Sequence, residues 1–351
     1  MTMQAKFRKH TLQFIIPGGT SRGVLQKKDS WFIQLWEDAN PLVCGVGECS
    51  IIPKLSVDDV PELETKIAES VSNINQLMNN AFHADLQVYP ALRFALETAL
   101  LDLQTGGRKQ LFLSEFTQGK ASIPINGLLW MGNFDFMWHQ AEKKFKEGFS
   151  VLKMKVGALD FDEEIYFISQ LRKCFPGIEL RLDANGGFPL DEALERLYAL
   201  NQFHIHSIEQ PIKAQNAGKM AELCKKSPIA IALDEELIGI YEKKSKEQLL
   251  KDIKPQYIIL KPSLLGGFRA SDEWIFLSEK MNIGWWATSA LESNIGLNAI
   301  AQWAFTKNNP LPQGLGTGSL YENNIASPLL VENGCLHFKP NNPWADLVEC
   351  M

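Results

Sequence analysis

Two lysines lie two residues apart in the segment VLKMKVG, residues 151 to 157, whose other side chains are apolar or absent. The segment is typical of a buried strand, and because side chains alternate along a strand, Lys153 and Lys155 point to the same face. Charged residues also end the next four apolar segments, at steps of 28, 26, 25 and 27 residues counted from Lys155. These residues are Asp183, Glu209, Asp234 and Lys261.

The three acidic residues of this series predict a metal site. Carboxylates brought to one place repel each other, so one of them must keep a proton unless a cation binds between them. Carboxylates, water and substrate oxygens are the ligands that Mg2+ prefers, and Mn2+ accepts the same ligands. A cation held by Asp183, Glu209 and Asp234 would stabilise the enediolate that forms when a proton is removed next to a carboxylate.

The lysines predict the base for that reaction. A lysine accepts a proton only if part of it is neutral near the working pH, and a neighbouring ammonium group disfavours the charged form. We therefore expect Lys153 to lower the pKa of Lys155 and also to reach the substrate carboxylate. Lys155 and Lys261 would flank the metal ion from opposite sides.

The elements that carry these residues indicate a barrel. From residue 121 to residue 318, short apolar strands alternate with helical patterns in one direction, which is typical of a (β/α)8-type, modified TIM barrel. The carboxyl ends of such strands converge where this fold places its active sites. We expect PQGLGTG, residues 312 to 318, to form the eighth strand. The helices are expected over 134–148, 160–174, 190–202, 215–226, 244–252, 268–280 and 294–305.

The rest of the chain predicts an α+β capping domain over residues 1–120, so the whole chain reads as an α/β protein. HTLQFIIP, DSWFIQLWED and VCGVGECSIIP read as strands, and helical patterns follow near 57–80 and from Pro90. The tail, 319–351, is too apolar for a disordered end, so we expect it to pack back on the cap and complete it.

Composition narrows the class of protein. The chain of 351 residues is 45% hydrophobic and has a formal net charge of -6, so no basic footprint indicates nucleic acid. No apolar run reaches the length of a membrane span and no signal peptide is evident, which favours the cytoplasm and no membrane partner. The six cysteines lack the close pairing of a zinc site, and the oligomeric state stays open.

The ordered series of Lys-x-Lys, Asp-x-Asn, Glu-Gln-Pro, Asp-Glu and Lys-Pro resembles the enolase superfamily, in its muconate-lactonising-enzyme subgroup. The resemblance covers nearly the whole chain, including the cap segment VCGVGECSIIP. It implies that Asn185 and Glu235 support the metal ligands from behind. Strand five reads Asp234-Glu235-Glu236 where the subgroup more often has Asp-Glu-Ser, and we take Asp234 as the ligand.

Within that subgroup, TSALESNIGL, residues 288 to 297, is similar to the serine-rich segment of the o-succinylbenzoate synthase family. That resemblance implies a syn dehydration in menaquinone biosynthesis, acting on a small carboxylate with a succinyl group. It also implies that Thr288, Ser289 and Ala290 bind the succinyl carboxylate, although the family's run has one more hydroxyl. The loop GGTSRGV, residues 18 to 24, is expected to be a lid that brings Arg22 to the ligand.

Two lysines on opposite sides of a metal ion also suit racemases and epimerases. An N-succinylamino acid racemase or a dipeptide epimerase on the same scaffold is therefore the alternative, and a muconate cycloisomerase is a weaker one. Dipeptide epimerases of the superfamily usually carry Asp-x-Asp at the end of strand eight to hold the substrate ammonium. Gly314-Leu315-Gly316 stands there in this chain, which counts against that activity. The alternative from another class is a barrel that binds an anionic ligand without catalysis. Such a protein would not exchange a proton of the ligand with solvent.

Overall fold

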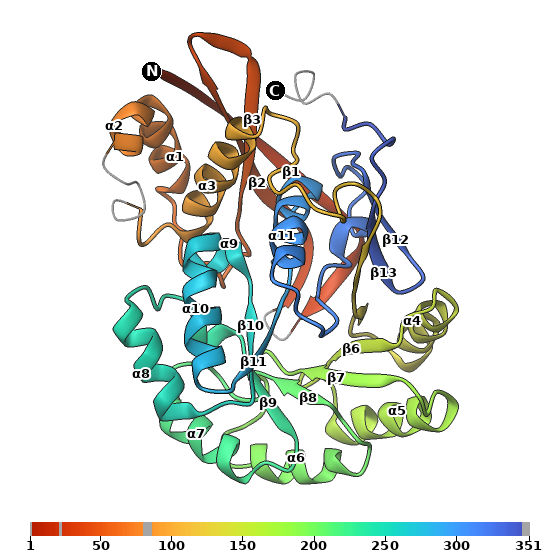
Figure 1. Cartoon of the computed structure of the whole chain (residues 1–351). Helices are drawn as coiled ribbons and strands as arrows, with labels where there is room; N and C mark the ends of the chain where they lie inside the picture. The colour runs from red at the N-terminus through yellow and green to blue at the C-terminus, as the bar shows by residue number, and fades with distance from the viewer. Residues whose placement is uncertain (1, 21–22, 80–85, 346–351) are drawn as a thin grey trace.

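The computed structural model in Figure 1 describes residues 2–20, 23–79 and 86–345. The first hundred or so residues form an antiparallel sheet with helices beside it, here called the cap. The chain then winds through parallel strands whose helices lie on the outside (Figure 1). The cap strands are β1 (Met3–Thr20), β2 (Gly23–Glu37) and β3 (Asn40–Ser50), and its helices are α1 (Leu63–Ser72), α2 (Ile74–Asn79) and α3 (Pro90–Gln104).

The central cap strand β2 is buried on both faces, because both of its faces meet other elements. Trp31, Ile33 and Leu35 pack against α1 and α3. Phe32, on the opposite face, packs against Ile295 of the barrel helix α11 (Asn294–Thr306). A strand that is buried on both faces needs apolar residues at consecutive positions, and β2 has them in Trp31, Phe32 and Ile33. The cap is thus fixed to the barrel by its own central strand.

Seven parallel strands form one sheet in the order β11-β10-β9-β8-β7-β6-β5, which is the order of the chain read backwards. Each strand is followed by one or more helices, and this alternation confirms the expected α/β architecture. The strands are β5 (Gly127–Leu129), β6 (Val151–Lys155), β7 (Glu179–Asp183), β8 (Ser207–Glu209), β9 (Ala230–Leu233), β10 (Tyr257–Leu260) and β11 (Gly284–Ala287).

The helices of this part begin and end close to the predicted positions. The largest difference is at 190–202, where the helix begins three residues later, after a turn that follows Pro189. The others are within two residues of their predicted starts. Besides α11, the helices are α4 (Phe134–Lys146), α5 (Phe161–Cys174), α6 (Ala193–Asn201), α7 (Ala217–Lys226), α8 (Lys243–Ile253), α9 (Pro262–Leu265) and α10 (Phe268–Lys280), with short 3-10 turns at Glu235–Leu237 and Thr317–Ser319.

Two predicted strand positions, the first and the eighth of the barrel, differ from the structure. The run IPINGLL is divided: β4 (Ser122–Pro124) leaves the barrel to pair with β13 (Cys335–Phe338), and only β5 joins the parallel sheet. The expected eighth strand appears as two isolated parallel bridges, Ile125 to Gln313 and Thr288 to Gly314, which link residues 313 and 314 to both edges of the sheet. The expected lid, 18–24, continues the β1–β2 hairpin, with Gly18–Thr20 in β1 and Gly23 in β2.

The segment after residue 318 contacts both parts of the molecule. β12 (Leu329–Glu332) pairs with β13, which pairs with β4 at the barrel. On the cap side, Tyr321 bridges to Phe14 of β1, and Trp344 packs against the Phe32 cluster. Among the described residues, none of the helices is long and apolar enough to cross a membrane.

Candidate active site

The charged residues predicted from the strand ends lie together at the carboxyl end of the parallel sheet. Lys155 is opposite Asp183 in the β6–β7 register, and Asp183 is opposite Glu209 in the β7–β8 register. Asp234 directly follows β9, and Lys261 directly follows β10. Parallel strands in register bring equivalent positions to one edge, which is why a sequence interval of 25 to 28 residues becomes a contact.

Lys153 lies between two carboxylates and is buried. Its Nζ is 2.8 Å from Asp183 Oδ2 and 2.5 Å from Glu209 Oε2. Burial acts to lower the pKa of Lys153, but the charges of Asp183 and Glu209 outweigh it and raise that pKa above the ordinary value. Lys153 is therefore held in the charged form and cannot accept a proton.

The pKa of Lys155 is shifted in the opposite direction to that of Lys153. Its Nζ is 2.7 Å from Asp183 Oδ2 and 2.5 Å from Asn185 Oδ1. Burial lowers the pKa of Lys155, Asp183 opposes this, and the neighbouring ammonium groups of Lys153 and Lys261 lower it further. The direction expected from the sequence agrees with this arrangement, but burial is a larger cause than Lys153.

Asn185 and Glu235 connect Lys155 to the next strands. Asn185 Nδ2 donates to Glu235 Oε1 at 2.9 Å, so its Oδ1 is turned toward the lysine. Asn185 has a φ of +44°, a left-handed conformation that asparagine tolerates better than most residues, and its N–H donates to Asp183 Oδ1. This turn aims the amide back at the site.

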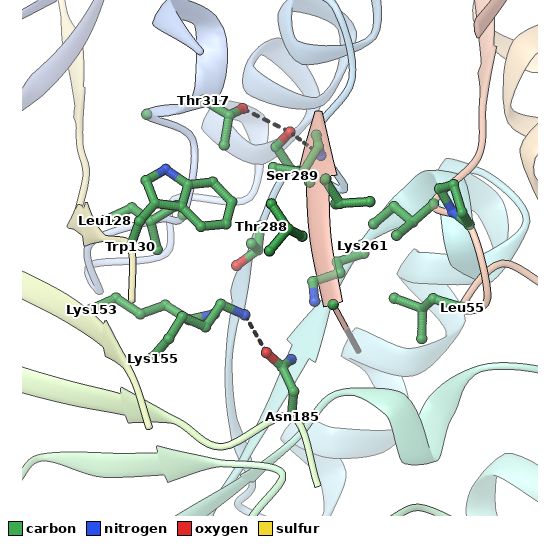
Figure 2. A pocket seen from close by; sticks show the side chains of 18 of the residues that line it. Leu55, Leu128, Trp130, Lys153, Lys155, Asn185, Lys261, Thr288, Ser289 and Thr317 are labelled. Carbon is green, nitrogen blue, oxygen red and sulfur yellow. Dashed lines mark hydrogen bonds between the residues drawn. The ribbon is translucent and has the colours of Figure 1, made fainter. Parts of the chain in front are cut away.

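Lys261 closes the opposite side of the cluster. It forms an ion pair with Asp234, and its Nζ lies 3.7 Å from Glu209 Oε1. Burial acts to lower the pKa of Lys261, but the charges of Asp234 and Glu209 raise it on balance. Lys261 is thus a fixed positive charge facing Lys155 across the pocket, as Figure 2 shows.

Glu209 lies between two other carboxylates, those of Asp183 and Asp234. Burial and the charges of Asp183 and Asp234 raise its pKa to about 8, against the pull of Lys153 and Lys261. Burial acts in the same direction on Asp183, but the three ammonium groups hold the pKa of Asp183 well below its usual range. The ammonium groups therefore offset burial for Asp183 but not for Glu209.

The donor set fits a hard divalent cation by its chemistry. Asp183, Glu209 and Asp234 offer only carboxylate oxygens, and Glu209 Oε1 is buried with no hydrogen-bond partner among the described residues. Within that same part of the chain, no three acidic, histidine or cysteine side chains converge as a metal cluster. In this arrangement the ammonium groups of Lys153 and Lys261 pair with these carboxylates instead.

A cavity of about 430 Å3 opens over the lysines, between the cap and the barrel (Figure 2). Two cap segments line it, Gly23–Lys27 of the β1–β2 hairpin and Ile52–Leu55 after β3. A pocket with apolar walls and a few charged groups at its floor is typical of a small-molecule site. The barrel side is lined by Asn126, Leu128, Trp130, Lys153, Lys155, Asn185, Lys261, Thr288, Ser289, Leu291, Gly314, Gly316 and Thr317.

The structure separates the residues expected to bind substrate. Thr288 and Ser289 line the cavity. Ala290 is buried and packs against Ile52 and Leu264. Arg22 lies outside the described residues.

Several cavity residues were missed by the sequence analysis. Asn126 immediately precedes β5, and its buried Oδ1 has no hydrogen-bond partner in the described structure. Trp130 directly follows β5. A search for functional side chains around every strand, rather than for charged ones alone, would have found both. The cap wall at residues 23–27 has no such signal, because its place depends on how the hairpin folds over the barrel.

Comparison with known proteins agrees with this geometry. Residues 137–343 match the family model described as Enolase C-terminal domain-like. The o-succinylbenzoate synthase of Desulfotalea psychrophila is 46% identical over 95% of this chain and 98% of the relative. A crystal structure of MenC from the same organism has a TM-score of 0.83 at 43% identity, covering 95% of this chain and 99% of the other. A dipeptide epimerase from Enterococcus faecalis, complexed with Mg and a dipeptide, also has a TM-score of 0.83, at 20% identity over 96% and 97% of the two chains.

The fold and the site thus define a member of the enolase superfamily. The likeness to the epimerase, at 20% identity, shows the fold alone. The 46% identity to the Desulfotalea psychrophila o-succinylbenzoate synthase, over 95% of this chain, shows the family within the superfamily. The chain belongs to the o-succinylbenzoate synthase family.

Proposed function

We propose that the protein is an o-succinylbenzoate synthase, a hydro-lyase of menaquinone biosynthesis. It would convert 2-succinyl-6-hydroxy-2,4-cyclohexadiene-1-carboxylate into 2-succinylbenzoate by syn elimination of water. The observation that carries the proposal is the geometry of the floor: Lys155 contacts Asp183 and Asn185 at the carboxyl end of the sheet and faces Lys261 across the cavity (Figure 2). The lowered pKa of Lys155 and the raised pKa of Lys153 beside it agree with this geometry. One lysine can then be a base while its neighbour stays charged, within a chain that belongs to this family.

Lys155 is the proposed base and acid. Its neutral amine removes the ring proton next to the carboxylate, which gives an enediolate and a Lys155 ammonium group. That ammonium then donates its proton to the departing hydroxyl, so the C–O bond breaks, water leaves and the ring becomes aromatic. One group serves both steps because both transfers occur on the same face of the ring.

Lys261 and Lys153 are proposed to act by charge. Lys261 faces the ring from the side opposite Lys155 and stabilises the enediolate while staying protonated, as its raised pKa favours. Lys153 is held beside Asp183 and Glu209, within reach of the substrate carboxylate that lies over them. Asn185 and Glu235 keep Lys155 directed at the reacting carbon through their hydrogen-bond chain.

Members of the superfamily depend on a divalent metal ion, and Mg2+ is proposed here, with Mn2+ able to replace it. Asp183, Glu209 and Asp234 would hold it, and their carboxylate oxygens suit such an ion. When bound, it supplies positive charge that stabilises the enediolate. The buried Glu209 Oε1 and the raised pKa of Glu209 support an additional cation at this place.

The substrate is proposed to lie with its ring over the lysines and its succinyl group toward Thr288, and Arg22 is proposed to contact it as well. The architecture is proposed to be a closed (β/α)8-type barrel over residues 121–318, with 313–314 as the eighth strand. The bridges of these residues to both sheet edges support closure. Residues 1–120 would be the capping domain, and contacts of Tyr321 and Trp344 with the cap support its completion by residues 319–351.

Racemisation of N-succinylamino acids is the second candidate, because Lys155 and Lys261 face each other and could each exchange an α-proton. Dipeptide epimerisation is less favoured. Gly314 and Gly316 line the cavity where carboxylates would be needed for a substrate ammonium, and a β-carbon at Gly314 would come within 2.5 Å of Thr288 Oγ1.

The test is turnover of the diene by the purified protein with Mg2+, followed by loss of diene absorbance. Lys155→Ala should lower kcat by a factor of about 1,000, in the range of a general acid–base residue. Lys143→Ala, which removes an exposed lysine, is the matched control and should keep wild-type activity. No turnover by folded, Mg2+-loaded wild type would refute the proposal, and N-acylamino acids and dipeptides would then be tested for α-proton exchange in D2O.

A further inference from the structure

A buried carboxylate behind the cavity wall has no role in the chemistry described so far. Glu292 is fully buried, and it is not among the described residues that line the cavity. Both of its oxygens accept hydrogen bonds from hydroxyl groups: Oε1 from Ser263, and Oε2 from Ser289 at 2.6 Å. Ser263 lies in α9, just after Lys261, and Ser289 lies in the cavity wall. Glu292 thus joins two strand ends of the active site.

The Ser289 hydroxyl is fully used by this network. A serine hydroxyl has one hydrogen to donate and two lone pairs to accept with. Its hydrogen goes to Glu292, while its oxygen accepts from Thr317 Oγ1 at 2.8 Å and from Leu291 N at 3.0 Å. The Ser289 N–H donates to Gly314 O. Both Ser289 hydrogens are therefore committed within the protein, although the residue lines the cavity.

The hydroxyl of Thr288, the neighbouring cavity residue, is not used in this way. Its N–H donates to Leu260 O, which fixes its backbone at the end of β11. Its buried Oγ1 has no hydrogen-bond partner among the described residues. Buried hydroxyls are normally paired, so an unpaired one in a cavity wall indicates a partner supplied by a ligand.

The cap contributes to the same buried network. Lys28 of β2 is buried, donates to Ser50, and its charge attracts those of Glu48 and Glu292. Burial raises the pKa of Glu292 on balance, and the Glu48 charge acts in the same direction, while the two serine hydrogen bonds and the Lys28 charge oppose that rise. Since Lys28 directly follows the hairpin residues that line the cavity, the cap wall and the barrel wall meet at one cluster of buried polar groups.

We propose that Glu292 is a positioning residue of the active site. It turns the Ser289 hydroxyl away from the substrate and fixes segment 288–291, so that Thr288 supplies the side-chain hydroxyl that binds the substrate's succinyl carboxylate. This inference rests on the proposed function for the identity of the ligand, but not for the ordering of the segment.

The experiment compares KM and kcat for wild type, Glu292→Gln, Ser289→Ala and their double variant. Glu292→Gln should raise KM about tenfold and change kcat less than threefold, because a side chain whose two oxygens accept hydroxyl hydrogens becomes an amide with donors of its own. In the Ser289→Ala background the same change should add less than twofold, because Glu292 acts through Ser289. Thr288→Val should raise KM about tenfold, and Thr288→Ser, which keeps the hydroxyl, should restore it.

Two kinetic results would overturn the proposal. One is a KM of Glu292→Gln within twofold of wild type while its Tm falls, which is the mark of a merely structural residue. The other is a full tenfold effect of Glu292→Gln in the Ser289→Ala background. A Thr288→Val variant with unchanged KM would overturn the assignment of the hydroxyl.

A ligand-free measurement separates this inference from the proposed function. Amide hydrogen exchange of Ser289 and Leu291, whose N–H groups bond to Gly314 O and Ser289 Oγ, should become at least tenfold faster in Glu292→Gln. If wild type fails to dehydrate the diene, the proposed function fails, and this exchange rate still decides whether Glu292 orders the segment. Unchanged exchange would refute the positioning role.

Discussion

A buried aspartate in the cap should make the stability of the protein fall as pH rises. Asp58 is fully buried in the segment between β3 and α1. Its Oδ2 accepts a hydrogen bond at 2.8 Å from the N–H of Ala91, in the first turn of α3, and its Oδ1 has no partner among the described residues. The same segment carries Ile52–Leu55 into the cavity wall. Asp58 thus anchors part of the active-site wall to the cap helix.

The size of the effect follows from the pKa. Burial raises the pKa of Asp58 to about 7, against the pull of backbone N–H groups. An aspartate in the unfolded chain has a pKa of about 3.9, so the folded state binds the proton more tightly. The folded state therefore loses stability as pH rises from about 4 to about 7, and the loss is complete above pH 7. At about 1.4 kcal/mol per pKa unit, the total is about 4 kcal/mol.

The assay is the difference in Tm between Asp58→Asn and wild type at pH 5, 6, 7 and 8. Asparagine keeps an acceptor for the Ala91 N–H but does not ionise, and the difference cancels groups common to both proteins. Between pH 5 and pH 8 the free-energy difference should grow by about 3 kcal/mol in favour of the variant. At about 2 °C per kcal/mol, the Tm difference should grow by about 6 °C.

A Tm difference that stays constant from pH 5 to pH 8 would refute the reasoning. It would mean that Asp58 ionises in the folded protein as easily as in the unfolded chain. The same constant difference would be seen if the Ala91 hydrogen bond outweighed burial, because a pKa below the unfolded value changes stability only below about pH 4.

Three further outcomes are expected. Glu48→Gln should lower Tm by about 5 °C, since Glu48 accepts from both the N–H and the hydroxyl of Ser293 at the start of α11; an unchanged Tm would contradict this. Gly47→Ala should lower the Tm strongly, because the added β-carbon would overlap the carbonyl oxygen of Ala95 in α3. Gly218→Ala, where the added β-carbon has open space, is the control and should leave the Tm unchanged. Equal Tm values for the two variants would show that α3 can move away from the added methyl group. Removal of divalent metal by a chelator should abolish turnover and added Mg2+ should restore it, and turnover that survives metal-free dialysis would exclude the metal role.

The active-site floor could be predicted from the sequence because it depends on local pattern and one rule of the fold. Each of Lys155, Asp183 and Glu209 is the last residue of its strand. Parallel register then brings them together without any need to know the intervening helices. The position of Lys153 follows from alternation alone, since it shares the face of Lys155.

The other parts of the site depend on contacts between distant segments. The sequence analysis assigned β4 to the first barrel strand because Ile123 and Ile125 look alike in sequence. In the structure, Ile123 pairs with β13, whereas Ile125 forms a parallel bridge to Gln313. The commitment of Ser289 to Glu292 is likewise invisible in TSALES, where every hydroxyl appears available. Whether a hydroxyl already has hydrogen-bond partners depends on how the cavity wall packs. Only the structure shows that the Thr288 hydroxyl, and not that of Ser289, is without one among the described residues.

The charges of the floor suit both ligands of the proposed reaction, the divalent cation and the dicarboxylate substrate. Three ammonium groups and three carboxylates are in contact there, yet the pKa of Glu209 is raised to about 8. Buried charge of one sign is costly unless it is matched. A divalent cation would relieve the carboxylates, and its charge in turn would be matched by a substrate that carries two carboxylates. Such a site favours a dianion over the zwitterionic substrate of a dipeptide epimerase, which agrees with the glycines where a substrate ammonium would need acids.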